Sequence, residues 1–488
     1  MLARLLRSLF AETHILRTLF GIALVAHLAV FFALLSIYGP CSFFLSNDCT
    51  LNGNDTQLYV IDAFNLTHGH GYSRFVDAPY EPDAMRTPLL PLYFAPFALA
   101  GGYSSIWLAI LLLNIVLSLA PLVIYKLARF FVPHGYAAVA GVFLALEPLY
   151  LYRSQIAEPD ALFVLLTVTA MYFLVRSWKE SRALDLYLAF GILGLSILAK
   201  PTSQYLLVIA LAFHMLNVFV FKRESWRMYL KHTALALVLV LAILSPWLVR
   251  NHAVFGVWGI SSVSGAALYE FYTNDIALPG EQVPLSIQEG SREPSRYLPY
   301  QNYFTHVAFA RIEAHPIAYM REQLVGSLRN LFVSDISSII YYGHTKILPF
   351  PYNPESGTSL HALLSAGDIS GFFSAFRSVL PKFMWTGTLF LMYVVALFGW
   401  ATAWRRDGKT FFIFALFFAV YAYLVVASGP YVEAKYRLPA MPLIIIVTLY
   451  GLDVLLPKMR VLVGMSLSEK HADDLKMRRA MSAGSARE

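Results

Sequence analysis

Charged residues are scarce in this chain. Only 14% of its 488 residues are Asp, Glu, Lys or Arg, and 58% are hydrophobic, whereas an average soluble domain has about 25% charged residues. Apolar runs long enough to cross a bilayer, which takes about 20 residues, recur along the sequence. This composition excludes an ordinary soluble protein and predicts an all-α polytopic membrane protein.

Cysteine is nearly absent as well, and the sequence shows no nucleotide-sugar motif, internal repeat or low-complexity segment. The only two cysteines, Cys41 and Cys49, both follow the first apolar run. If that region lies outside the cytoplasm, a disulfide between them is favoured, and two free thiols are the alternative. The sequence leaves this choice open.

The surplus of positive charge reflects how the chain crosses the membrane. The net charge of +7 invites a nucleic-acid partner, but the Lys and Arg residues stand mostly in short loops between apolar runs. Cytoplasmic loops of membrane proteins are rich in these two residues. We therefore expect membrane lipids as partners and no nucleic acid.

The apolar runs predict about ten transmembrane helices. These lie near residues 16–38, 104–130, 136–152, 159–175, 183–198, 201–221, 229–249, 383–403, 411–427 and 439–456. Another apolar run, Pro88–Gly101, is too short for a span and contains three prolines. We expect it to form a re-entrant or interfacial helix on the outer side.

The basic loops predict the orientation of the chain. With the N-terminus inside, every inner loop carries Lys or Arg, as the positive-inside rule requires. We expect a multi-pass protein of a bacterial inner or plasma membrane, with both termini cytoplasmic and the active site extracytoplasmic. The expected parts are an amphipathic cytoplasmic lead-in (1–15), a transmembrane module (16–249) with a catalytic first outer loop (39–103), an extracytoplasmic segment with interfacial helices (250–382), C-terminal transmembrane helices (383–456) and a cytoplasmic tail (457–488).

The most polar part of the chain follows the first predicted span. Residues 55–92 carry five carboxylates and Arg86 before a proline-rich apolar run, which indicates chemistry at the boundary between water and lipid. Asp55 in this stretch and Glu158 in the later turn IAEPDAL are candidates for taking a proton from an acceptor. Burial near lipid raises the pKa of a carboxylate towards the working pH.

Cations at the predicted outer ends of several spans break the orientation rule. For a single residue, the simple explanation is a side chain that reaches up to water. Several together, beside prolines and on one side of the membrane, favour a shared site for an anion, and phosphate is the main candidate. These residues are Arg86, Arg153, Lys200, Arg250, Lys435 and Arg437.

Seven motifs occur in order along almost the whole chain. They are NDTQLYVIDAFNLTHGHGYS, MRTPLLPLYFAPFALAGG, EPLYLYRSQIAEPDAL, LAKPTSQYL, SPWLVRNHAVFG, ARIEAHPIAYM and EAKYRLPAMPLIII. Together they resemble the GT-C superfamily of integral membrane glycosyltransferases. The likeness is greatest to the branch of dolichyl-phosphate-mannose–protein mannosyltransferases and of the bacterial aminoarabinose transferases that modify lipid A. The resemblance implies a GT-C-like fold with its site on the outer face.

The resemblance also implies roles for particular residues. Asp55 matches the catalytic base, and Glu158 matches a second acid near the site. The expected donor-phosphate ligands are Arg86, Lys200, Arg250 and Arg437, to which the charge pattern adds Lys435. The sequence departs from the family at two places. It has Thr87-Pro88 where the family often has a pair of prolines, and it has Asn54 where the family has an acid next to the catalytic base.

The reaction implied is a single inverting displacement. A hydroxyl or amine of a lipid, glycan or protein acceptor attacks the sugar of a polyprenyl-phosphate donor, and Asp55 takes the proton. Polyprenyl phosphate leaves with its charge held by the cations. No cofactor is firmly expected and no metal ligand is assigned, but a divalent metal held by His68, His70 and Asp55 is an alternative.

Two other functions fit part of the pattern. A transporter or flippase of a lipid-linked sugar needs many spans and a headgroup site, although it predicts matching halves and charges at mid-membrane. A polyprenyl-diphosphate-dependent glycan ligase is the nearest enzymatic alternative. In the outer segment, four tyrosines are candidates for stacking on sugars, with interfacial anchoring as the alternative role: Tyr269, Tyr272, Tyr341 and Tyr342.

Overall fold

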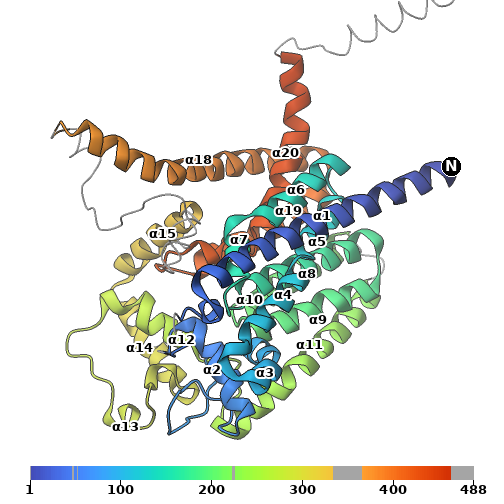
Figure 1. Cartoon of the computed structure of the whole chain (residues 1–488). Helices are drawn as coiled ribbons and strands as arrows, with labels where there is room; N and C mark the ends of the chain where they lie inside the picture. The colour runs from blue at the N-terminus through green and yellow to red at the C-terminus, as the bar shows by residue number, and fades with distance from the viewer. Residues whose placement is uncertain are drawn as a thin grey trace, which may run out of the picture.

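The protein is built from helices joined by turns and by several longer loops (Figure 1). The computed structural model describes residues 2–46, 49–51, 53–221, 226–333, 365 and 367–462, and these ranges contain no β-strand. Outside the described residues lie Lys222 and Arg223, which belong to one of the basic loops predicted on the inner side, the candidate stacking residues Tyr341 and Tyr342, and the tail beyond residue 462.

Seven helical stretches are long and apolar enough to cross a membrane, among the residues described. They are Glu12–Tyr38 of α1 (Leu2–Tyr38), the stretch Leu89–Ala128, α8 (Asp160–Glu180), α10 (Ser203–Phe221), α11 (Trp226–Phe255), Phe383–Arg406 of α18 (Ile369–Arg406), and α19 (Gly408–Ala427). Three shorter apolar helical stretches accompany them: α6 (His134–Leu146), α9 (Ala183–Ala199) and Met441–Leu456 of α20 (Met441–Leu462). Each predicted span coincides with one of these elements, which confirms the all-α polytopic fold.

The helix boundaries differ from the predicted ones in three places. The predicted lead-in and first span form one unbroken helix, α1. The predicted span 104–130 is divided into α4 (Ile106–Leu117) and α5 (Ala120–Ala128). The predicted span 136–152 is divided into α6 and the short α7 (Pro148–Arg153), because Pro148 has no N–H to continue α6, and the Glu147 side chain caps α7 instead.

The proline-rich run after Arg86 forms a helix of its own, as predicted. This helix, α3 (Leu89–Gly101), ends at Gly102, whose φ of +63° favours glycine. A 3-10 turn, Gly102–Ser105, then leads into α4. α3 packs against α2 (Asp55–Thr67) of the first outer loop.

Close packing at glycine joins the C-terminal spans. At the crossing of α18 and α20, a Cβ added to Gly399 would lie 2.6 Å from the carbonyl oxygen of Val447 and 3.0 Å from the backbone nitrogen of Gly451. Small residues let helix backbones approach closely in a membrane, where dispersion contacts replace the hydrophobic effect. These two glycines therefore set the distance between α18 and α20.

The first outer loop is fixed to the transmembrane bundle at several points. Cys41 and Cys49 form a disulfide, which resolves the choice that the sequence left open. The 3-10 helix Pro40–Phe44 buries Phe43, whose carbonyl accepts a 2.7 Å hydrogen bond from the N–H of Ala157. α2 follows, with Asn54 as its N-cap accepting from the N–H of Gln57.

The large outer segment forms a series of helices and turns, of which α12 lies next to α2 and α15 lies near α18 (Figure 1). They are α12 (Val263–Ala267), the π turn Leu268–Tyr272, the 3-10 helices Asn274–Ile276, Pro294–Arg296 and Leu298–Tyr300, α13 (Leu285–Gln288), α14 (Gln301–Ala314) and α15 (Pro316–Phe332). The helical periodicity predicted over 304–332 is thus confirmed as α14 and α15. The Ser261 hydroxyl donates to the carbonyl of Met85 at 2.6 Å, which joins this segment to the first loop.

Candidate functional site

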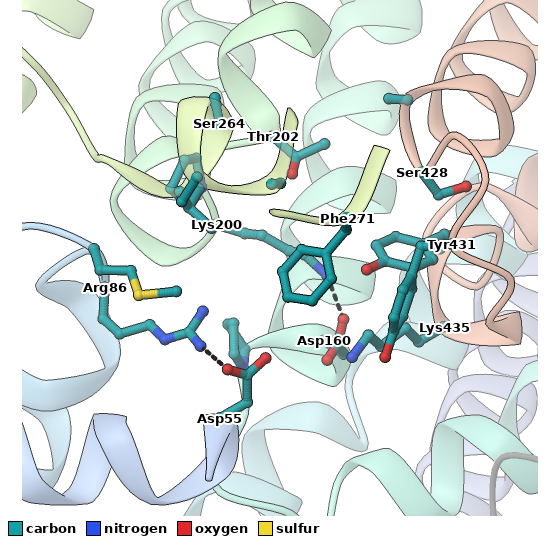
Figure 2. Close-up of a pocket in the computed structure, with 18 of the residues that line it drawn as sticks. Asp55, Arg86, Asp160, Lys200, Thr202, Ser264, Phe271, Ser428, Tyr431 and Lys435 are labelled. Carbon is teal, nitrogen blue, oxygen red and sulfur yellow. Dashed lines mark hydrogen bonds and ion pairs between the residues drawn. The ribbon is translucent and has the colours of Figure 1, made fainter. Parts of the chain in front are cut away.

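A cavity of about 380 Å³ lies where the first outer loop, several span ends and the outer segment meet (Figure 2). Its lining carries three carboxylates and four cations, so positive charge is in surplus by one. The charged residues are Asp55, Arg86, Glu158, Asp160, Lys200, Arg296 and Lys435. They come from six separate stretches of the sequence, and only the fold brings them together.

Asp55 stands in the first turn of α2, where the helix dipole favours a carboxylate. It pairs with Arg86, whose guanidinium is buried and stacks over Tyr59. The Asp55 side chain is 66% exposed, so it is open to a ligand in the cavity. The surrounding protein tends to raise the pKa of Asp55, but the charges of Arg86, Lys435 and Arg296 outweigh this and hold the pKa below its usual range.

Glu158 lies in the turn between α7 and α8 and accepts a 2.5 Å hydrogen bond from the Thr56 hydroxyl of α2. Arg153, which is completely buried, donates to the other Glu158 oxygen at 2.7 Å and also pairs with Glu433. Burial raises the pKa of Glu158 although Lys435 and Arg153 oppose it. Arg153 thereby ties the Glu158 turn to the loop between α19 and α20.

The opposite side of the cavity holds two lysines, each beside an acid. Lys200, at the end of α9, pairs with Asp160 in the first turn of α8 (Figure 2). Lys435 lies 2.9 Å from Glu433. Burial disfavours the ammonium of Lys435, but Glu433 and Glu158 outweigh it and raise its pKa. The Lys435 ammonium is therefore held charged at the cavity.

The outer segment covers the cavity and adds Arg296. Its guanidinium donates to both oxygens of Glu270, at 3.0 to 3.2 Å, and lies 3.6 Å from Glu293. Aromatic side chains complete the wall, and they give a surface on which a sugar ring could stack. They are Tyr59, Tyr205, Phe271, Tyr272, Tyr423, Tyr431 and Tyr436.

Five of the seven predicted site residues line the cavity: Asp55, Arg86, Glu158, Lys200 and Lys435. Arg250 and Arg437 do not. Arg250 donates to the carbonyl of Asp83 at 2.6 Å and packs over the ring of Trp247. Arg437 is buried and donates to the carbonyl of Asn330 at 3.0 Å. Both guanidiniums thus join elements that stand behind the cavity walls.

Two charged lining residues were not among the predicted site residues. Asp160 is two residues beyond Glu158 in the same turn, so its position at the start of a span could have indicated it. Arg296 lies in a stretch without periodicity, and no sequence signal points to it. Of the four candidate stacking residues, Tyr272 lines the cavity, whereas Tyr269 packs against Phe304 and Arg311.

The geometry does not assemble the alternative metal site. Among the described residues, no group of three or more His, Cys, Asp or Glu side chains could hold a metal ion. His68 is engaged with the carbonyl of Phe64 at 2.8 Å, and His70 with the side chain of Asn65 at 3.2 Å. The acids of the cavity are each paired with a cation, as described above.

The fold and the site define a class: a polytopic all-α membrane protein with a charged cavity where its spans meet an outer cap. Residues 86–249, about a third of the chain, match the family described as dolichyl-phosphate-mannose-protein mannosyltransferase. The resemblance to membrane glycosyltransferases that the motifs indicated is thereby confirmed for this region. No curated protein matches the chain.

Solved structures with a similar arrangement come from the archaeon Archaeoglobus fulgidus. The oligosaccharyltransferase AglB in complex with an inhibitory peptide and a dolichol-phosphate is 13% identical, with a TM-score of 0.47 over 94% of this chain and 52% of its own. The same organism's oligosaccharyltransferase tethered with an acceptor peptide containing the NVT sequon is 14% identical, with a TM-score of 0.48 over 94% and 51%. A complex of it with Zn and sulfate is 17% identical, with a TM-score of 0.45 over 92% and 51%. The chain spans about half the length of these proteins.

Proposed function

We propose that this protein is a membrane glycosyltransferase that moves a sugar from a polyprenyl-phosphate donor to an acceptor on the extracytoplasmic face. The observation that carries the proposal is the cavity, which sets one exposed carboxylate, Asp55, among four cations. A surplus of positive charge suits a phosphate, and a carboxylate open to the same space suits proton transfer from an acceptor. The match of residues 86–249 to a mannosyltransferase family supports the same reading.

The chemistry is an inverting displacement. The acceptor oxygen or nitrogen forms a bond to the anomeric carbon, and its proton passes to Asp55. The bond between that carbon and the phosphate oxygen breaks, and polyprenyl phosphate leaves with the electron pair. Arg86, Lys200 and Lys435 are fixed around the cavity, so they stabilise the added charge of the leaving group with little reorganisation.

The ion pair of Asp55 with Arg86 has a role in this scheme. In the unliganded cavity, Arg86 holds the pKa of Asp55 low and makes it a weak base. A donor phosphate competes for the same guanidinium, which weakens the pair and makes Asp55 a better base. The base therefore becomes active when the donor is in position. In this scheme Arg250 and Arg437 do not contact the donor. They stabilise the elements behind the cavity walls through their hydrogen bonds to the carbonyls of Asp83 and Asn330.

The predicted organisation belongs to the same proposal. The first outer loop, within 39–103, supplies the base, and the segment 250–382 covers the acceptor side. The module 16–249 and the C-terminal helices 383–456 hold the site at the outer surface of a bacterial inner or plasma membrane. The lead-in 1–15 and the tail 457–488 are cytoplasmic. The acceptor is a lipid, a glycan or a protein.

The test is release of free polyprenyl phosphate from lipid-linked sugars by purified protein in the presence of candidate acceptors. We expect turnover by the wild type and a loss of at least about 100-fold in Asp55→Asn, the usual scale for removing a general base. The matched control is Asp77→Asn, an exposed acid of the same loop outside the cavity. Equal turnover by Asp55→Asn and wild type would remove Asp55 from the mechanism.

Other outcomes distinguish the alternatives. Specific binding of a lipid-linked sugar without turnover, across donors and acceptors, would favour the transporter or flippase. Release of polyprenyl diphosphate would favour the glycan ligase. Parallel reactions with EDTA test the divalent metal. Because each cavity carboxylate already faces a paired cation, we expect turnover to survive chelation.

A further inference from the structure

α15 exposes an apolar face. Four large side chains on it are 49% to 82% exposed, and their spacing of three or four residues puts them on one side of the helix. They are Ile317, Met320, Leu324 and Leu328, and we call them the α15 stripe. In water, such a contiguous apolar surface is unfavourable and marks an interaction site.

The C-terminal end of α15 is level with the outer part of a transmembrane helix. Tyr393 of α18 donates to the carbonyl of Leu331 at 2.8 Å, and Thr386 donates to the carbonyl of Phe332 at 3.3 Å. The apolar span of α18 begins at Phe383. At about 1.5 Å per residue, Thr386 lies roughly 5 Å and Tyr393 roughly 15 Å into that span. α15 therefore ends at the depth of the outer leaflet, beside α18 (Figure 1).

The opposite face of α15 supports a wall of the cavity. A Cβ added to Gly326 would lie 2.5 Å from the carbonyl oxygen of Gly429, so the two backbones are in close contact. The Asn330 amide donates to the Ser428 hydroxyl at 2.7 Å and accepts from the N–H of Glu433 at 2.9 Å. Ser428 itself lines the cavity. α15 thus carries the exposed apolar stripe on one face and contacts the cavity-wall segment 426–436 with the other.

We propose that α15 is an interfacial helix whose stripe inserts between acyl chains of the outer leaflet, so that the bilayer holds the cavity wall 426–436 in place. At the start of the neighbouring α18 span, Phe383 and Met384 are likewise 63% and 65% exposed, as apolar side chains that face lipid would be. The exposed cations Arg321 and Arg329 on the same helix suit lipid phosphates at the edge of such an insertion. This surface goes beyond the proposed transfer reaction and does not depend on it.

Depth-dependent quenching tests the insertion. Leu324→Cys and, on the polar face, Glu322→Cys are labelled with a fluorophore in the full-length protein, in phosphatidylcholine nanodiscs. Because both native cysteines are in a disulfide, the reporter thiol is the reactive one among the described residues. We expect lipids with a nitroxide on the acyl chain to quench the label at 324 several-fold more than the label at 322, and aqueous iodide to do the reverse. Equal iodide quenching at both sites would overturn the proposal, and so would shielding of the 324 label from both quenchers, since protein would then cover the stripe.

Hydrogen exchange tests the connection to the cavity wall. In the same nanodiscs, Leu324→Glu should speed amide exchange in 426–436 at least several-fold, because a charge in the stripe removes α15 from the acyl region. Glu322→Gln is the matched control and should leave exchange unchanged. Unchanged exchange in Leu324→Glu would overturn the connection. Neither measurement needs turnover, so failure here is separate from failure of the transferase proposal.

Discussion

Asp55 and Arg86 are the residues on which the proposed chemistry turns, and their pairing predicts a pH dependence. In the folded protein, desolvation by the surrounding protein raises the pKa of Asp55, but the charges of Arg86, Lys435 and Arg296 outweigh this effect, so the pKa lies below its usual value of about 4. Asp55 is then a carboxylate throughout the neutral range, and kcat/KM should fall only below about pH 4. In Arg86→Gln, less positive charge opposes this desolvation, so the acid limb of the profile should move up by about one pH unit or more.

The measurement is kcat/KM against pH for both proteins, with Arg182→Gln as the control. Arg182 is an exposed arginine that pairs with Glu180 away from the cavity. Its profile should match that of the wild type. If Arg86→Gln lowers turnover but leaves the acid limb in place, then Arg86 does not act on the ionisation of Asp55.

Asp62, about two turns along α2 from Asp55, is predicted to weaken the fold at neutral pH. It is fully buried, and neither of its oxygens has a hydrogen-bond partner among the described residues. Burial and the charge of Asp83 raise its pKa well above the usual value despite Arg74, Arg86 and Arg250. When the pKa of an acid is higher in the folded than in the unfolded protein, the free energy of unfolding falls as the pH rises from the unfolded-state pKa, about 4, towards the folded-state pKa. Asp62→Asn keeps the size and shape of the side chain but removes its ionisation.

We therefore expect Asp62→Asn to have a higher melting temperature than the wild type at pH 7 to 8, with the difference vanishing near about pH 4. Thermal unfolding of the purified proteins in detergent over this pH range measures it. A lower melting temperature of Asp62→Asn at pH 8 would mean that the wild-type carboxylate is charged and stabilised in the fold.

The sequence indicated which charged residues lie on the outer side, but not where their side chains point. Arg86 and Arg250 carry the same signal, a cation near a proline at an outer span end. Arg86 faces the cavity, whereas Arg250 bonds the carbonyl of Asp83. The difference depends on the path of the first loop, which no local pattern encodes. Arg296 shows the same limit, because a cap built from irregular turns positions it.

At the scale of the helices, the apolar runs were informative because lipid requires every span to satisfy its backbone internally. All predicted spans have a helical counterpart. What could not be predicted is the division of a run, as at Ser118–Leu119 between α4 and α5. There both sides remain apolar, and the break depends on packing. The helices of the outer segment were harder to predict, because only α14 and α15 have apolar residues at helical spacing in the sequence.

The crossing of α18 and α20 yields a prediction about stability. In Gly399→Ala the new methyl group would lie 2.6 Å from the carbonyl of Val447, so the helices must separate. We expect a loss of about 1–3 kcal/mol, the usual cost of overpacking, measured as a lower melting temperature in detergent. The control on the same helix is Gly387→Ala, where a Cβ would meet nothing within 4 Å. Equal melting temperatures for the two variants would show that the crossing tolerates a wider spacing.

At the scale of the whole molecule, the charged cavity, the disulfide and the capping segment gather at one end of the spans, while basic loops stand at the other. α19 illustrates the polarity, because it begins at Gly408 after Arg405 and Arg406 and reaches the cavity at Ala427. Its 20 residues cover about 30 Å, which is the thickness of the hydrocarbon core. From the positive-inside rule we infer that the cavity lies outside the cytoplasm.

This orientation predicts which sites a reagent can reach from outside the cell. A membrane-impermeant maleimide should label Asp77→Cys, on the exposed part of the first loop, in intact spheroplasts. It should label Lys409→Cys, exposed at the start of α19, only after the membrane is opened. The reverse pattern would put the cavity in the cytoplasm. Nucleotide sugars are available in the cytoplasm, so a cytoplasmic cavity would remove the argument from location for a lipid-linked donor.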